Sequence, residues 1–267
     1  MESIQVETVD GVRLVGVHVT PDGGDRPGLA FVLAHGFTVS SRKPTVRRIA
    51  RRLARHGGVL AIDFRGHGRS GGRSSVGDAE VLDIDAAVRL ARALGYERVA
   101  TLGFSMGGAI VLRQAARAAT VSGLTPTETV DAVVSVSAPS RWYVRDTPPM
   151  RRVHWLLESR TGRLVSATVL RTRLGREWVE APESPVEVVA RIPPTPLLIV
   201  HGGQDLFFGV SHGRNLAGAA GDAAELWEIA GFGHAEGATT PALVDRIAGW
   251  VAGRVAGTAR PAGTIGP

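Results

Sequence analysis

The sequence predicts an α/β protein whose mostly parallel, eight-stranded sheet has helices on both faces. Three observations support this prediction. Short apolar, β-branched runs alternate with helical patterns along the chain, an alternating hairpin pattern precedes them, and a glycine-flanked serine joins one such run to an Ala-rich helical stretch. Strands that alternate with helices favour parallel pairing, because each crossover helix returns the chain to the same edge.

The strands are predicted as follows. The runs Ile4–Thr8 and Arg13–Val19 flank Asp10-Gly11, which indicates a hairpin. Buried strands are expected at Leu29–Ala34, Val59–Phe64, Arg98–Leu102, Ala132–Val136, Leu197–His201 and Ala224–Ile229. Helices are expected between most of them, at Pro44–Arg55, Asp78–Leu94, Met106–Ala119, Ser211–Ala219 and Pro241–Val255.

One segment interrupts the alternation. About sixty residues separate the predicted strands Ala132–Val136 and Leu197–His201, too many for one crossover helix. They include Trp142, Trp155 and Trp178 among many arginines. We expect residues 1–140 and 193–256 to form the core, 141–192 a helical lid of two short helices over the sheet edge, and 257–267 a disordered tail. The alternative is an elaborated crossover with a structural role only.

The serine lies in Gly103-Phe104-Ser105-Met106-Gly107, after a short strand and before a helix. This is the context in which G-x-S-x-G forms a nucleophile elbow. The turn brings strand and helix close on either side of the serine, so the residues two positions before and after it, Gly103 and Gly107, must lack a Cβ. Ser105 is therefore the predicted nucleophile, and an N-terminal helix cap is the alternative role.

An acyl-transfer serine needs a base and a residue that orients the base. Asp205 follows the strand Leu197–His201, and His234 follows the last strand, so both reach the edge of the sheet that carries Ser105. The order Ser…Asp…His is the one expected for this architecture. Asp205 could instead cap the next helix while Asp222 or Glu225 orients His234.

The oxyanion donors are expected to be main-chain N–H groups. Met106 supplies one, directly after the serine, and the loop His35-Gly36-Phe37-Thr38 supplies the other, with Phe37 N–H as our choice. Gly36 would let the backbone turn inward, and the Phe37 side chain would wall the acyl pocket. His35, Trp142 and Trp155 are the expected neighbours of the substrate; His35 chiefly supports the loop, and His154 is a further candidate from the lid.

With these segments the chain resembles the α/β-hydrolase superfamily. It is most similar to the branch of serine esterases, monoacylglycerol lipases and cinnamoyl-type esterases. The resemblance is carried by H-G-F-T at 35–38, D-F-R-G-H-G-R-S at 63–70, G-F-S-M-G-G at 103–108, H-G-G-Q-D at 201–205 and G-H at 233–234. The family usually has a proline soon after the acid, near Phe208 and Gly209, and this chain has none there. Serine as the nucleophile argues against the dehalogenase and epoxide-hydrolase branches, which the resemblance associates with aspartate.

The charge of the chain bears on which kinds of partner it could bind. The net charge is +6, carried almost wholly by arginine, and the densest cluster lies between Arg42 and Arg55. Apolar residues interleave there at helical spacing, while no aromatic residue is present to stack on bases, so we expect a solvated helix face and no nucleic-acid partner. A basic-surface binding protein is the alternative.

Other features of the composition set the remaining expectations. The chain lacks cysteine, and its histidines have no zinc-like spacing, so neither metal nor cofactor is expected. No signal-peptide pattern or membrane-spanning run is seen, and we expect a cytoplasmic protein.

The predicted function is a serine hydrolase that cleaves carboxylic esters of small to medium apolar acyl groups, with a small-molecule ester as its partner. The same residues would serve a thioesterase, an amidase or an acyltransferase. A non-catalytic ligand-binding protein on the hydrolase fold is the alternative from another class. The sequence leaves the oligomeric state open.

Overall fold

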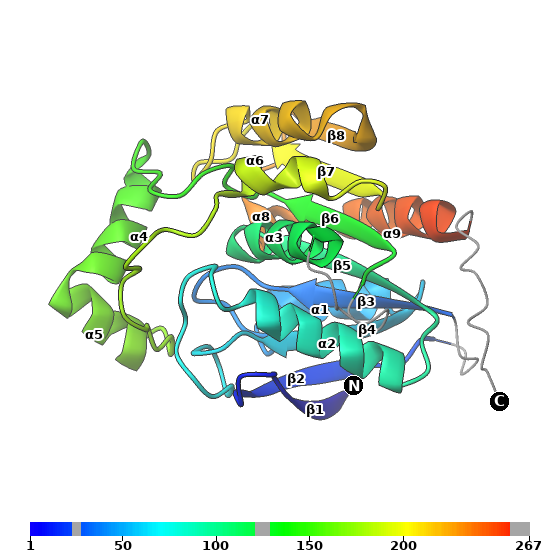
Figure 1. The fold of residues 1–267 in the computed structure, drawn as a ribbon, viewed down its shortest axis with the longest axis horizontal. Helices are drawn as coiled ribbons and strands as arrows, with labels where there is room; N and C mark the ends of the chain where they lie inside the picture. Colours follow the sequence, from blue (N-terminus) through cyan, green and yellow to red (C-terminus); the bar gives the residue numbers. More distant parts are fainter. Residues whose placement is uncertain (23–27, 121–128, 257–267) are drawn as a thin grey trace.

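The computed structural model of the chain describes residues 1–22, 28–120 and 129–256 (Figure 1). Its strands form one eight-stranded sheet in the order β1-β2-β4-β3-β5-β6-β7-β8. β2 pairs antiparallel with β1 and β4, and the remaining neighbours are parallel. The predicted fold class, with its antiparallel entry hairpin, is confirmed. The predicted tail, 257–267, lies outside the described residues.

The strands occupy the predicted runs with small shifts at their ends. They are β1 (Glu2–Glu7), β2 (Arg13–Val19), β3 (Leu29–Ala34), β4 (Gly58–Asp63), β5 (Arg98–Phe104), β6 (Ala132–Val136), β7 (Leu197–Gly202) and β8 (Ala224–Ile229). β5 is longer than predicted because Gly103 and Phe104 pair with Ser135 and Val136 of β6. Such pairing extends a strand through residues whose own preference does not mark it.

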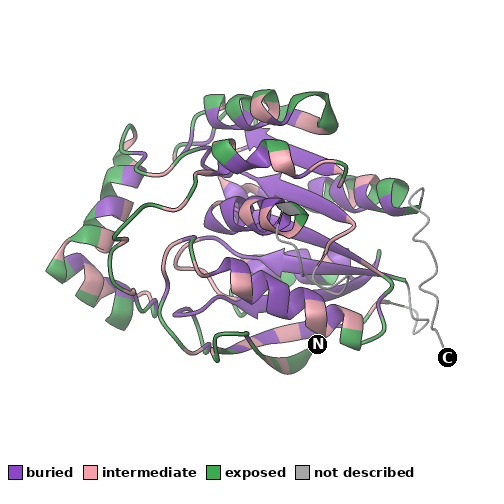
Figure 2. Cartoon of the chain, in the orientation of Figure 1, coloured by how far each residue is buried: buried purple, intermediate pink, exposed green. Residues whose placement is uncertain are grey.

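Helices cover both faces of the sheet (Figure 1). One core cluster joins the sheet to α2 (Val81–Ala93), α3 (Met106–Thr120) and α7 (Ser211–Ala220). The other joins it to α1 (Pro44–Leu53) and α9 (Pro241–Ala256). Figure 2 shows the central strands, β3 to β7, buried between these two layers. In the described ranges, no helix combines the length and apolar character needed to cross a bilayer.

The basic helix α1 has the amphipathic character that its sequence predicts. Val46, Ile49, Ala50 and Leu53 are buried against the sheet and α9. The arginines between them point outward, and Arg52 pairs with Asp245 of α9. The apolar stripe thus packs α1 against the sheet and α9.

The helix α2 begins at Val81, later than the predicted Asp78, because Glu80 organises the preceding loop. The buried carboxylate of Glu80 accepts hydrogen bonds from Ser74 Oγ (2.7 Å), Ser75 N–H (2.9 Å) and Gly77 N–H (2.9 Å). These bonds hold residues 74–77 in a non-helical turn. The turn forms one side of the cavity described below.

The segment between β6 and β7 contains the helices α4 (Pro148–Glu158) and α5 (Arg160–Thr168), which stand beyond one end of the sheet (Figure 1). The last part of this segment, residues 185–192, belongs to the main core instead. The short helix α6 (Pro185–Val188), the turn η1 (Val189–Arg191) and Ile192 pack with α3 and α7 in the main core. The end of the predicted insertion, 141–192, therefore lies in the helical layer of the sheet.

Hydrogen bonds fasten the insertion to the loop after β4. Arg173 N–H donates to Gly66 O (2.8 Å), and Ser74 N–H donates to Arg173 O (2.8 Å). Trp178 Nε1–H donates to Ser75 O (2.7 Å). On its other side, Thr147 Oγ1 donates to Phe207 O (3.0 Å), which follows β7. The insertion is thus attached on both sides of the site that it covers.

Candidate active site

Ser105 occupies a strained turn between β5 and α3. Its φ of 51° lies in the left-handed region, which costs energy for a residue with a Cβ. A Cβ at Gly103 would clash with Gly107 O, and one at Gly107 would clash with Ala34 O. Gly103 therefore lets β5 and α3 approach each other, as the sequence predicts, and Gly107 lets the start of α3 pack against the end of β3.

Ser105, His234 and Asp205 form a continuous chain of hydrogen bonds. Ser105 Oγ lies 3.0 Å from His234 Nε2. His234 Nδ1 lies 2.8 Å and 3.0 Å from the two carboxylate oxygens of Asp205. A carboxylate can only accept, so Nδ1 carries the proton and Nε2 is free to accept from the serine hydroxyl. The three predicted residues meet at the carboxyl edge of the sheet.

Backbone donors hold the Asp205 carboxylate in place. Phe207 N–H (2.8 Å) and Phe208 N–H (3.0 Å) both donate to Oδ1. Burial opposes ionisation of Asp205, but the hydrogen bond from His234 and those from Phe208 and Phe207 together hold its pKa below the ordinary value. A proline at position 208 would remove one of these donors, which gives a physical reason for its absence here.

The other acids considered for this role lie elsewhere. Glu225 accepts hydrogen bonds from the indoles of Trp227 and Trp250, each at 2.7 Å. Asp222 lies in the exposed turn η2 (Gly221–Ala223) before β8. Of these acids, only Asp205 has a described hydrogen bond to His234.

The two predicted oxyanion donors are Phe37 N–H, in the loop after β3, and Met106 N–H, directly after Ser105. Met106 is the first residue of α3, where N–H groups lack an intrahelical acceptor. Phe37 N–H has no acceptor within the described part of the chain. The left-handed residue of this loop is Thr38, with φ 60°, and not Gly36, so the turn itself occurs two residues later than expected.

His35 supports this loop from below and does not line the cavity, contrary to its predicted place at the substrate. Its Nε2 accepts from Phe64 N–H (3.1 Å), and its Nδ1–H donates to Gly36 O (2.8 Å). Complete burial lowers the pKa of His35 to about 4, against the opposing effect of the Gly36 bond. The ring is therefore neutral at pH 7.

This burial predicts a pH dependence of stability. Between about pH 6.5 and 4 the unfolded chain protonates position 35 and the folded chain does not, so the free energy of unfolding falls as the pH is lowered through this window. The contribution of His35 lost by pH 4 is about 3 kcal/mol. Urea unfolding at pH 7 and pH 4.5 measures it. His35→Gln, which keeps an acceptor for Phe64 N–H, should fall less steeply than wild type; an equal fall in both would contradict the assignment.

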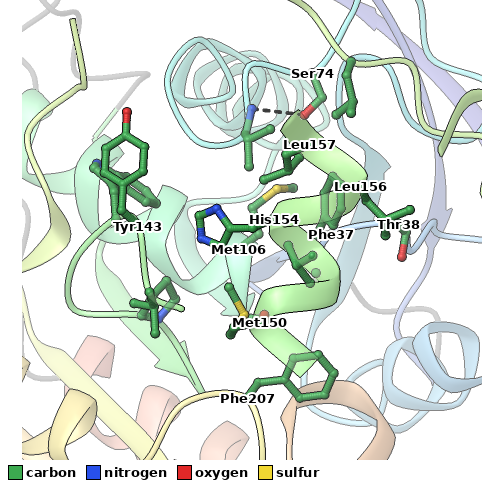
Figure 3. A pocket seen from close by; sticks show the side chains of 18 of the residues that line it. Phe37, Thr38, Ser74, Met106, Tyr143, Met150, His154, Leu156, Leu157 and Phe207 are labelled. Atoms are coloured by element: carbon green, nitrogen blue, oxygen red, sulfur yellow. Dashed lines mark hydrogen bonds between the residues drawn. The ribbon is translucent and has the colours of Figure 1, made fainter. Parts of the chain in front are cut away.

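A cavity of about 740 Å³ opens in front of Ser105 and His234, between the sheet edge and the insertion. Figure 3 shows Phe37 and Met106 among the side chains that line it, together with Met150, His154 and Leu157 of α4 and with Phe207. Its apolar wall consists mainly of Phe37, Val39, Met106, Trp142, Val144, Met150, Val153, Leu156, Leu157, Trp178, Phe207 and Phe208. The volume and lining are those of a small-molecule site.

The two predicted tryptophans have different positions. Trp142 lines the cavity, and its indole N–H donates to Pro182 O (2.7 Å). Trp155 was placed wrongly: it is 47% exposed and is not part of the wall. Met150, Val153 and Leu157 share the inward stripe of α4, and the helical period turns Trp155 away from that stripe.

Most of the arginines around the cavity have partners of their own. Arg145 pairs with Glu158 (2.6 Å) and Arg141 with Asp146 (3.0 Å). Arg163 donates to Leu157 O (2.9 Å). Carboxylates therefore balance the charges of Arg145 and Arg141.

Two functional neighbours were not predicted from the sequence. Phe207 stacks on the His234 ring, with centroids 4.2 Å apart and an interplanar angle of 23°. Glu236 is buried at the cavity wall beside Gly36. The only signal in the sequence was the place of each residue, two positions after Asp205 and His234 respectively. In residues 1–22, 28–120 and 129–256, no three His, Asp or Glu side chains gather as metal ligands.

Comparison with known proteins places this geometry in a family. Residues 30–163, half of the chain, match the family model described as alpha/beta hydrolase fold. The esterase Pf2001 of Pyrococcus furiosus superimposes with a TM-score of 0.71 at 22% identity, over 95% of this chain and 91% of that one.

Two further solved structures are similar at comparable coverage. The esterase RhEst1 of a Rhodococcus species gives a TM-score of 0.67 at 20% identity, over 95% of this chain and all of that one. Est1E of Butyrivibrio proteoclasticus, solved with ferulic acid bound, gives 0.64 at 18% identity, over 95% and 99%. At these identities the likeness concerns the fold.

Proposed function

This chain belongs to the α/β-hydrolase fold family, and from that premise we propose that it is a serine hydrolase of carboxylic esters with small to medium apolar acyl groups. The observation that carries the proposal is the hydrogen-bond chain from Ser105 Oγ through His234 to Asp205, with the serine facing an apolar cavity. Nucleophile, base and orienting acid at these distances are the arrangement that acyl transfer requires.

The reaction follows from the geometry. His234 Nε2 takes the proton of Ser105 as Oγ attacks the ester carbonyl carbon, and the N–H groups of Phe37 and Met106 stabilise the resulting oxyanion. His234 then gives this proton to the departing alcohol, which leaves an acyl-serine. A water molecule, deprotonated by His234, attacks the acyl carbonyl, and collapse of the second tetrahedral intermediate returns the proton to Ser105 and releases the acid. Asp205 keeps His234 in the required tautomer and stabilises its cationic form.

The insertion supplies the specificity in this proposal. The side chains of Met150, Val153 and Leu157 offer the acyl group an apolar wall, and burial of each added methylene favours binding by about 0.8 kcal/mol. Hydrogen bonds join residues 172–178 to the loop after β4, which supports an insertion held in a fixed position over the acyl group. We therefore propose residues 141–184 as the lid.

Initial rates on p-nitrophenyl esters with acyl chains of two to twelve carbons test the proposal. We expect kcat/KM to rise with chain length, to reach a maximum within the series and then to decline once the cavity is filled. If folded protein hydrolyses none of the esters, the proposal is wrong. Thioesters and amides of the best-fitting acyl groups would then separate the other reactions that the same triad can perform.

A further inference from the structure

A second carboxylate lies close to the proposed oxyanion hole. Glu236 is the second residue of the short helix α8 (Ala235–Ala238), two positions after His234, and only 6% of its surface is exposed. It lines the cavity in front of Ser105. The triad and the two oxyanion donors make no use of it.

The carboxylate of Glu236 is bound to the loop that carries Phe37. Gly36 N–H donates to Glu236 Oε1 at 2.7 Å, across 200 positions of the chain. A Cβ added at Gly36 would lie 3.4 Å from both Glu236 Oε2 and Ser105 Cβ. The loop at Gly36, the Glu236 carboxylate and Ser105 therefore lie next to one another.

Gly36 is held at both of its backbone polar groups. Glu236 accepts from its N–H, and His35 Nδ1–H donates to its carbonyl oxygen at 2.8 Å. That carbonyl belongs to the peptide group whose N–H is that of Phe37, and in a trans peptide the two point in opposite directions. A carbonyl directed at His35 thus directs Phe37 N–H to the other side of the chain. The bond to Glu236 limits rotation about the preceding peptide.

Retaining a carboxyl group at this place costs free energy. Burial raises the pKa of Glu236, although the hydrogen bond from Gly36 and the proximity of His234 oppose the shift. In the described part of the chain no lysine or arginine pairs with it, and His234 is the charged group that acts on its pKa. A buried acid kept under these conditions indicates a role beyond packing.

We propose that Glu236 is a positioning residue that holds Gly36, so that Phe37 N–H is aimed at the oxyanion formed on Ser105. This inference depends on the proposed serine-hydrolase function. For this role the Glu236 side chain must supply a hydrogen-bond acceptor to Gly36 N–H. The oxygen at Oε1 is therefore required, and the negative charge is not. Glu236→Gln retains such an oxygen, whereas Glu236→Ala leaves Gly36 N–H without a partner.

The test compares Glu236→Ala and Glu236→Gln with wild type on the best p-nitrophenyl ester. In Glu236→Ala we expect kcat to fall about 10- to 100-fold with KM within about threefold of wild type, because the misplaced donor acts on the transition state. Inhibition by an alkyl trifluoromethyl ketone, which forms a tetrahedral adduct, should weaken by a similar factor. Glu236→Gln should stay within about threefold of wild type in both measurements.

Asp85→Asn is the matched control. Asp85 is also buried, but it binds Gln114 (2.9 Å) and Arg117 between α2 and α3, and none of the three lines the cavity. The Asp85→Asn substitution should lower Tm and leave kcat unchanged. This outcome would separate a positioning role of Glu236 from a general loss of stability.

Two results would overturn the inference: kcat unchanged in Glu236→Ala, or equal losses in the Ala and Gln variants, which would mean that the charge is used. Ser105→Ala is measured alongside. If it hydrolyses as fast as wild type, the proposed function itself fails and this inference fails with it.

Discussion

Ser105→Ala is expected to lower kcat for ester hydrolysis by about four to six orders of magnitude while the protein stays folded. The substitution removes only the hydroxyl group, and its oxygen, Oγ, is the atom that would form the acyl bond. Backbone strain is unaffected, because alanine at φ 51° meets the same Cβ clash as serine. The lost contact is the 3.0 Å hydrogen bond to His234. Tm should therefore move by only a few degrees.

Hydrolysis rates, Tm and labelling by a fluorophosphonate probe measure this prediction together. Wild type should be labelled at Ser105 and the variant should not. Ser135→Ala is the matched control, since Ser135 is a buried serine on the adjacent strand whose Oγ donates to Gly108 O (3.2 Å). It should keep both label and turnover. Labelling of wild type without turnover of any ester would instead favour a ligand-binding protein on this fold.

The parts of the fold that the sequence predicts are those with a local signal. The alternation of apolar runs with helical patterns reflects the periods of strand and helix, and it located the strands of the sheet to within one or two residues. Gly103 and Gly107 mark the elbow because α3 passes too close to β5 and to the end of β3 for a Cβ at these two positions. Ser105, Asp205 and His234 follow β5, β7 and β8, parallel strands whose carboxyl ends share one edge of the sheet, so their meeting there is predictable.

The parts that the sequence does not predict depend on contacts between distant segments. Glu236 meets Gly36 across 200 positions, and Glu80 shapes a loop by accepting several backbone N–H groups at once. Neither leaves a periodic pattern. In α4, both Trp155 and His154 fit an amphipathic helix, and only the docking of that helix decides which one faces the cavity. Propensity and period cannot supply that information.

The orienting acid gives the second large effect: Asp205→Asn is expected to lower kcat by about 10⁴ with little change in KM. Phe207 N–H and Phe208 N–H both donate to Oδ1, so position 205 must keep an acceptor there. The asparagine NH₂ would then occupy the place of Oδ2, which lies 2.8 Å from His234 Nδ1. An NH₂ group donates, so His234 would carry its proton on Nε2 and could no longer accept the proton of Ser105.

The test measures kcat from pH 5 to 9 for wild type and for Asp205→Asn, with Glu225→Gln as the control variant. Because the pKa of Asp205 is below its ordinary value, the wild-type carboxylate stays ionised throughout this range, and the loss in the variant should persist at every pH. Glu225 binds two indoles and does not meet His234, so Glu225→Gln should hydrolyse esters at nearly the wild-type rate. A variant at 205 that kept more than about a tenth of the wild-type kcat would show that another group orients His234.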